Sequence, residues 1–181
     1  MDLLKRTRRA AVALLLCAAT AGSALAAPPP NEYALKSVFL YNFCRFIEWP
    51  DAAFAGPSDP IVIGVLGDDP FGPLLDEAVQ GESFRGRQIR IDHYRSLRDI
   101  GRCHLLFVAA SETPRLNEIL SAVAGKSIVT VGETEGFIER GGMIGLVADR
   151  NRVRLLVNPD TLRAARLDVS SKLLRVAEIT R

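Results

Sequence analysis

Two histidines and three cysteines are the side chains in this sequence best suited to metal or nucleophilic chemistry. His93 and His104 lie eleven residues apart, and no cluster of Cys, His and Asp has the spacing of a metal site. Cys103 precedes His104 in an apolar run typical of a strand, so their side chains should point to opposite faces. The G-x-S-x-G and P-loop motifs are absent from the sequence. We therefore expect a protein that is not an enzyme and that binds no metal or cofactor.

Two segments carry residue types suited to binding an anion. Gly67–Gly72 connects an expected strand to an expected helix, the position where open α/β sheets bind ligands. A helix N-terminus there favours anions, although Asp68 would repel a phosphate; the alternative is a turn with a capping aspartate. Arg87 follows Arg85 and Gly86 before the next expected strand. Its guanidinium can bind a carboxylate or phosphate, or it can belong to a charge-paired surface.

Two later loops are candidates for contact with a partner protein. Gly136–Gly142 ends in two glycines, and Phe137 within it is either an exposed apolar contact residue or a core side chain. The segment Asp149–Asn151 joins two expected strands and forms a hairpin tip beside the second strand. The partner-binding residues that we expect are Phe137, Asp149, Arg150 and Leu155.

The first 30 residues have the pattern of an export signal. Met1–Arg9 carries four basic residues, Ala10–Ala21 is almost wholly apolar, and Ala24–Ala26 has the small-x-small pattern of a cleavage site. The apolar run is shorter than the ~20 residues needed to cross a bilayer. We expect a signal peptide over residues 1–26 with cleavage near Ala26, a short linker over 27–30, and one periplasmic domain over 31–181 without direct membrane insertion.

Charge and cysteine content constrain the expected mature domain. Without the leader, 19 basic and 20 acidic residues remain, so the near-neutral domain offers no argument for nucleic-acid binding. Cys44 and Cys103 also remain. An oxidising compartment permits a single bridge between them; the alternative is two buried free thiols.

Hydrophobic periodicity predicts helices and strands in alternation. Helices are expected over residues 31–49, 71–80, 113–125, 158–167 and 170–179, and strands over 61–66, 88–92, 104–109, 127–131, 143–148 and 153–157. Continuous apolar strands alternating with helices favour a parallel sheet covered on both faces. The predicted fold is a single α/β domain with a mostly parallel sheet flanked by helices on both faces and a late antiparallel hairpin.

Several segments together resemble the YfiR-like family, long catalogued as a domain of unknown function. The resemblance covers residues 31–179. The segments that carry it are Tyr33–Lys36, Phe39–Phe43, Ile47–Pro50, Val65–Gly72, Cys103–Val108, Gly141–Ile144 and Leu167–Leu174.

This resemblance implies a periplasmic regulator that represses a membrane-bound diguanylate cyclase. Such a protein binds the periplasmic sensor region of the inner-membrane cyclase, lowers cyclic di-GMP and opposes biofilm formation; the resemblance also implies self-association as a homodimer. Family members often have a cysteine in the first strand, where this sequence has Gly64. The alternative is a periplasmic protein that binds an anionic metabolite or a nucleotide through Asp68 and Arg87.

Overall fold

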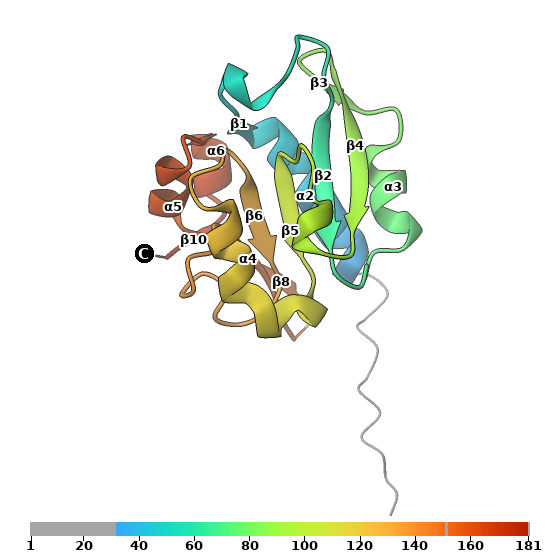
Figure 1. Ribbon diagram of the computed structural model, residues 1–181. Helices are drawn as coiled ribbons and strands as arrows, with labels where there is room; N and C mark the ends of the chain where they lie inside the picture. The colour runs from blue at the N-terminus through green and yellow to red at the C-terminus, as the bar shows by residue number, and fades with distance from the viewer. Residues whose placement is uncertain (1–31, 151, 181) are drawn as a thin grey trace, which may run out of the picture.

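The computed structural model describes residues 32–150 and 152–180, so the predicted signal peptide and linker lie outside the described residues. Helices alternate with short strands along most of this range (Figure 1). The α-helices are α2 (Glu32–Phe46), α3 (Pro73–Val79), α4 (Leu116–Val123), α5 (Pro159–Ala164) and α6 (Ser171–Leu174). The strands are β1 (Ile47–Glu48), β2 (Ile61–Leu66), β3 (Ser83–Phe84), β4 (Arg87–Tyr94), β5 (Leu105–Val108), β6 (Val129–Gly132), β7 (Ile144–Asp149), β8 (Arg152–Val157), β9 (Asp168–Val169) and β10 (Glu178–Ile179). Short 3-10 helices occupy Asp51–Ala53, Leu97–Asp99 and Ala110–Arg115.

Eight of the described strands form the central sheet, in the order β10-β8-β7-β6-β5-β2-β4-β3. The pairs from β4 through β2, β5 and β6 to β7 are parallel. β7 and β8 form an antiparallel hairpin in which Ile144 lies opposite Val157. This arrangement confirms the predicted fold class of a mostly parallel sheet with a late antiparallel hairpin.

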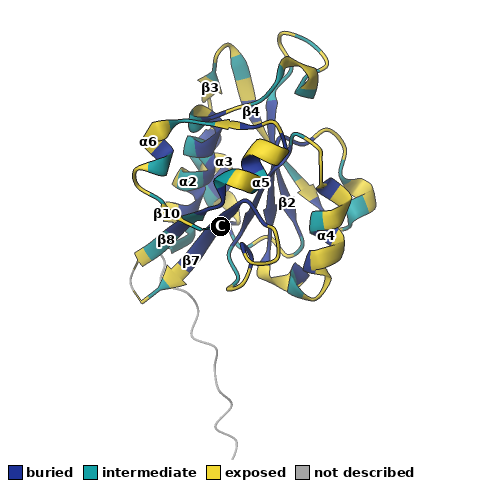
Figure 2. Ribbon diagram, turned by 90° about the vertical axis from the view of Figure 1, so that its left-hand side faces the viewer, coloured by how far each residue is buried: buried dark blue, intermediate teal, exposed yellow. Residues whose placement is uncertain are grey.

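The two faces of the sheet bury separate apolar clusters. Leu40 and Phe43 of α2 pack in one cluster with side chains from α3, α5 and α6. Leu116 and Ile119 of α4 pack in the second cluster, on the opposite face. In Figure 1, α2 crosses behind the sheet and α4 lies in front of it, and Figure 2 shows the buried sheet between exposed outer elements. The second face has the sparser helical cover.

Strand β2 shows why a continuous apolar run becomes the middle of this sheet. All six of its residues are buried, as expected for a parallel strand covered on both faces. Gly64 at its centre is required by packing, because a Cβ atom there would collide with the ring of Tyr94 and lie 3.0 Å from Cys103 Sγ. The aromatic ring therefore fills the space that a side chain at position 64 would need.

The C-terminal segment differs from its prediction. The expected helix over residues 170–179 is only one turn long in α6, although Ser170 Oγ caps it by accepting from the Lys172 N–H. Val176 is 72% exposed, so a longer helix would gain little apolar burial there. Instead β10 pairs in parallel with β8, and the Thr180 N–H donates to the Val157 carbonyl.

The possible bridge between Cys44 and Cys103 is absent, and both residues are buried free thiols. Cys44 belongs to the cluster under α2, whereas Cys103 belongs to the cluster under α4. The sheet therefore separates the two sulfur atoms, and of the two alternatives the structure has the pair of buried free thiols. Burial raises the pKa of each thiol to about 12, which keeps both in the unreactive protonated form.

Candidate functional site

An open groove lies on the sparsely covered face of the sheet, beside the C-terminal strand. We call it the C-terminal groove; its volume is about 340 Å³. The loop of residues 134–139 forms one wall and β10 the other, with β7 and β8 beneath them. The lining residues used below are Ile138, Gly145, Val147, Arg154, Leu156 and Glu178.

The floor of the C-terminal groove is apolar. Val147 and Leu156 contribute side chains from neighbouring antiparallel strands, and Ile138 lies beside them. Gly145 adds no side chain to this floor; a Cβ atom there would contact Leu156 and Ile138 at 3.3 and 3.5 Å. The groove therefore offers apolar contact area without a deep cavity, a shape suited to a side chain of a protein partner.

One rim of the C-terminal groove is charged. Arg154 of β8 donates to both carboxylate oxygens of Glu178, at 3.0 and 2.6 Å. This pairing raises the pKa of Arg154 and lowers that of Glu178. Because both groups are open to solvent, the pair contributes little to stability, and backbone pairing positions β10 against β8.

Phe137 lines this groove but cannot supply an exposed contact. Its side chain is only 2% exposed, so the prediction of an apolar contact residue at this position is wrong and the core alternative is correct. The ring lies between Gly132 and Gly142, where a Cβ atom on either residue would collide with it. Of the two adjacent glycines seen in the sequence, Gly142 therefore makes room for the Phe137 ring, together with Gly132 of β6.

Leu155 also differs from its expected role. It is 5% exposed and packs in the cluster on the α2 face of the sheet. Successive side chains of a strand point to opposite faces, so the neighbouring Leu156 faces the C-terminal groove instead. Leu155 is therefore a core side chain, and Leu156 is the leucine of this strand that lines the groove.

The tip of the β7–β8 hairpin is exposed at one end of the same strands. Arg150 is exposed and has a φ of 57°, the left-handed conformation of a tight turn. Asp149 Oδ2 accepts from Arg152 Nη2 at 3.3 Å. Asn151 lies outside the described residues. The two described tip residues are thus available to a partner, although their role stays a prediction.

Sequence reasoning missed the exposed apolar side chains of the C-terminal tail. Val176 is 72% exposed and Ile179 is 48% exposed. They lie in and just before β10, whose Glu178 and Thr180 line the groove. The periodic pattern assigns both residues to a helix over 170–179; the signal against that helix is two β-branched side chains in this polar segment.

The loop at Asp68 does not form an anion cradle. Gly67, with a φ of 96°, comes so close to Ser111 and Glu112 that a Cβ atom would lie 2.5 and 2.7 Å from their side chains. The Asp68 N–H donates to Ser111 Oγ at 2.9 Å. The side chains after β5 thus fill the crevice at the carboxyl ends of β2 and β5, where an α/β protein would bind a ligand.

Arg87 holds a loop in place. Its Nη1 donates to the carbonyls of Gly56 and Asp59, at 2.8 and 2.9 Å. Its guanidinium lies 3.8 Å from the centre of the Phe54 ring. The Arg87 guanidinium is therefore already engaged by hydrogen bonds and stacking within the protein, where we expected it to bind an anionic ligand. Asp68 and Arg87 do not form one site, because they lie at opposite ends of the paired strands β2 and β4.

A buried ion cluster that the sequence analysis did not single out lies at the start of α2. Lys36 is 2% exposed, and its Nζ lies 2.6 Å from Glu32 Oε1 and 2.7 Å from Glu133 Oε2. Glu133 Oε1 accepts from the Ala110 N–H at 3.1 Å. The pKa of nearby Tyr33 is raised, first by desolvation and then by the Glu133 charge. This cluster joins α2 to the segments that follow β5 and β6.

His104 is a buried histidine with a structural role. The Val62 N–H donates to its Nδ1 at 3.0 Å, which places the proton of the neutral ring on Nε2. The ring stacks on Phe54 at 4.4 Å and meets Trp49 edge-on. Desolvation lowers its pKa to about 4, with further lowering by the charges of Arg102 and Arg87. The imidazole is therefore held neutral at pH 7.

Within residues 32–150 and 152–180, the chain has no group of three or more His, Cys, Asp or Glu side chains placed to hold a metal ion. In the same part, no helix has both the length and the apolar character needed to cross a bilayer.

Comparison with solved structures supports the fold. A conserved domain protein from Vibrio cholerae O1 biovar El Tor superimposes with a TM-score of 0.52 at 12% sequence identity. The superposition covers 66% of this chain and 54% of that chain, so the likeness spans about half of the other protein and concerns architecture alone. No curated protein matches the sequence.

Comparison with protein families shows the family of this chain. The YfiR/HmsC-like family matches residues 33–178, nearly the whole described domain. This family consists of regulatory proteins of the periplasm. The match includes the elements that build the C-terminal groove, from the 134–139 loop to β10. The chain belongs to the YfiR/HmsC-like family.

Proposed function

We propose that this protein represses a membrane-bound diguanylate cyclase by binding the periplasmic sensor region of that enzyme. Family membership supports a regulator. The observation that carries the proposal for the site is the C-terminal groove together with its rim strand β10, the edge strand of the sheet, which carries the exposed Ile179 on the face opposite the groove. A surface of this kind provides apolar area that a partner can bury.

Repression from outside the membrane requires only differential affinity. The regulator must bind the inactive conformation of the cyclase more tightly than the active one. Shifting an enzyme from almost fully active to almost fully inactive needs a preference of about 5.5 kcal/mol. The protein needs no catalytic group for this task, since the cyclase itself carries out the chemistry.

The C-terminal groove alone is smaller than a regulatory interface, so neighbouring elements must contribute contact area. A stable interface buries about 800 Å² on each partner, with apolar residues at its centre. We place Leu156 near that centre, and the partner reaches Ile179, on the other face of β10, by extending around this edge of the sheet. The hairpin tip with Asp149 and Arg150 then contributes polar contacts at the periphery.

The alternative of a small-ligand receptor receives less support. The crevice next to Asp68 is filled by Ser111 and Glu112. Arg87 is engaged by two carbonyls and an aromatic ring. The features that motivated a ligand site in the sequence are thus occupied within the protein.

The test measures cellular cyclic di-GMP in a deletion strain complemented with variants. The wild-type chain should lower cyclic di-GMP, whereas Val176→Asp combined with Ile179→Asp should not. Val38→Asp on α2 is the matched control, because Val38 and Ile179 are both 48% exposed. Equal export of all variants is checked by immunoblotting of the periplasmic fraction.

Binding is measured in parallel with the purified periplasmic region of the candidate cyclase. Loss of binding in the double variant, with normal binding by Val38→Asp, is the expected result. If deletion leaves cyclic di-GMP unchanged while the cyclase is expressed, the proposed function is wrong. If repression persists in the double variant, the function stands and the edge of the sheet at β10 is not part of the binding surface.

A further inference from the structure

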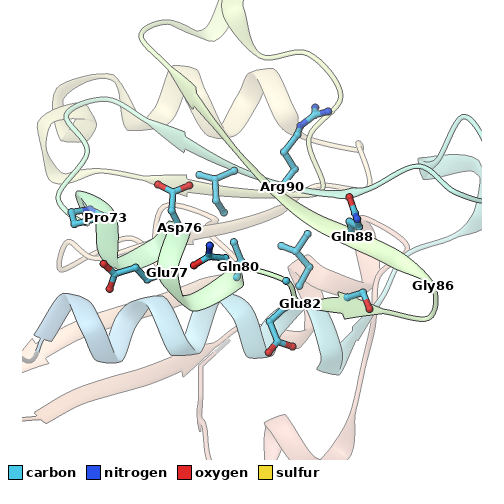
Figure 3. Close-up of a pocket in the computed structure, with 13 residues that line it drawn as sticks. Pro73, Asp76, Glu77, Gln80, Glu82, Gly86, Gln88 and Arg90 are labelled. Atoms are coloured by element: carbon cyan, nitrogen blue, oxygen red, sulfur yellow. The ribbon is translucent and has the colours of Figure 1, made fainter.

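A second groove lies at the other edge of the sheet, between α3 and the outer edge of β4. We call it the edge groove; its volume is about 830 Å³. Figure 3 shows Gln88 and Arg90 of β4 along one side and Asp76 and Glu77 of α3 on the other. The function proposed above makes no use of this groove.

Most of the outer edge of β4 is unpaired in the described chain. β3 pairs only with Arg87 and Gln88 at the start of β4, whereas the inner edge pairs with β2 from Ile89 to Tyr94. The Ile89 N–H points outward, since it donates to the Glu82 carbonyl at 3.4 Å.

Backbone groups of a strand alternate in direction, so those of Ile91 and His93 point to the same side as those of Ile89. Neither residue has a hydrogen-bond partner on that side within residues 32–150 and 152–180. The edge groove therefore presents a row of backbone donors and acceptors in line with β3.

β4 lacks the devices that commonly protect a sheet edge. It contains no proline, and every residue in it has a negative φ, so the strand is not interrupted by a left-handed turn. Its central charge, Arg90, is satisfied by Asp92 of the same strand through two hydrogen bonds of 2.9 Å. A regular edge of this kind is a template for another strand.

The charge of the edge groove indicates which strand would fit. Asp76, Glu77 and Glu82 are exposed acidic residues of the lining. Arg90 is the basic residue of the lining, and Asp92 engages its guanidinium. The uncompensated charge is therefore negative, and it favours a segment carrying lysine or arginine.

We propose that the edge groove binds an extended, basic peptide segment of a partner protein by strand addition. The segment pairs with the backbone of Ile91 and His93, and its basic side chains lie near Asp76 and Glu77. Five residues opposite Ile89–His93 would span about 17 Å, because a strand rises ~3.3 Å per residue. This binding does not depend on the repressor function, since it requires neither the cyclase nor the C-terminal groove.

The test uses the purified domain and a capped synthetic peptide of alternating valine and lysine. Calorimetric titration should show saturable binding, and hydrogen exchange monitored by NMR should slow at the Ile91 and His93 amides. A peptide of alternating valine and glutamate is the charge control. The Asp76→Asn, Glu77→Gln double variant should bind the lysine peptide about fivefold more weakly or worse.

Backbone methylation of the peptide tests strand pairing without altering the protein. A strand uses alternate amides on each edge, so methylating one set should weaken binding at least tenfold and methylating the other should leave it intact. The proposal is overturned if the lysine peptide does not bind, or if both methylated peptides bind equally well. It is also overturned if sedimentation shows that a second copy of the chain occupies this edge.

Discussion

Replacing Lys36 with methionine should strongly destabilise the fold. The Lys36 ammonium is the cation between two largely buried carboxylates, with side-chain exposures of 12% for Glu32 and 6% for Glu133. Methionine has a similar length but carries no charge, so both carboxylates would keep their desolvation cost without their counter-ion. The Ala110 N–H would still donate to Glu133, but it carries no compensating charge.

The expected loss follows from that geometry. Removing one partner of a buried ion pair typically costs 3–5 kcal/mol, and here a single cation serves two carboxylates. We therefore expect Lys36→Met to lower the free energy of unfolding by about 3–5 kcal/mol at pH 7. A domain of this size has a total stability of about 5–15 kcal/mol, so the change should be plain in a denaturation curve.

Urea unfolding followed by far-UV circular dichroism measures this loss. Lys126→Met is the matched control, because Lys126 is exposed, and it should change the unfolding free energy by less than about 0.5 kcal/mol. Adding Glu133→Gln to Lys36→Met removes one stranded charge and should recover part of the loss. A loss below 1 kcal/mol in Lys36→Met, or no recovery in the double variant, would refute the reasoning.

Three further predictions concern buried groups. The pKa of His104 is lowered to about 4, so the unfolded chain binds an extra proton between about pH 6.5 and pH 4, and stability should fall as pH decreases through that window. His104→Asn, which keeps an acceptor but does not titrate, should flatten this dependence in thermal melts at stepped pH. Cys44 and Cys103 should resist a thiol reagent in the native protein and both react in urea; rapid labelling of either one without denaturant would contradict their burial. Phe137→Ala should cost about 3–5 kcal/mol in urea unfolding while Phe137→Leu costs much less, and equal effects would show that the ring does not fill the space between its glycines.

The sequence predicts the centre of this fold better than its margin. β2 and β5 are recognised because strands buried on both faces need continuous apolar runs, and Ile61–Leu66 and Leu105–Val108 are such runs. β10 is missed because its two residues fall within the helix predicted over residues 170–179, which ends at Leu174 in the structure. Its pairing with β8 depends on backbone groups, which the side-chain pattern does not report.

The site residues show a similar division between local and long-range information. The alternation along β8 can be read from the sequence, so Leu156 could have been assigned to the open face once Leu155 was assigned to the core. The role of Lys36 cannot be read in this way, because its partner Glu133 lies 97 residues away. Arg87 likewise meets carbonyls of a loop 28 to 31 residues earlier.

The position of the charged groups bears on how binding and folding can be separated in this regulator. Lys36 and Arg87 are engaged inside the molecule, where they hold α2 and the loop before β2. The groups around the C-terminal groove are exposed, and their ion pair contributes little to stability. A substitution of Ile179 therefore changes contact area that the folded chain does not use, whereas a substitution of Lys36 removes a contact that the fold requires. We therefore expect substitutions of Ile179 to abolish repression without loss of stability, and substitutions of Lys36 to destabilise the fold.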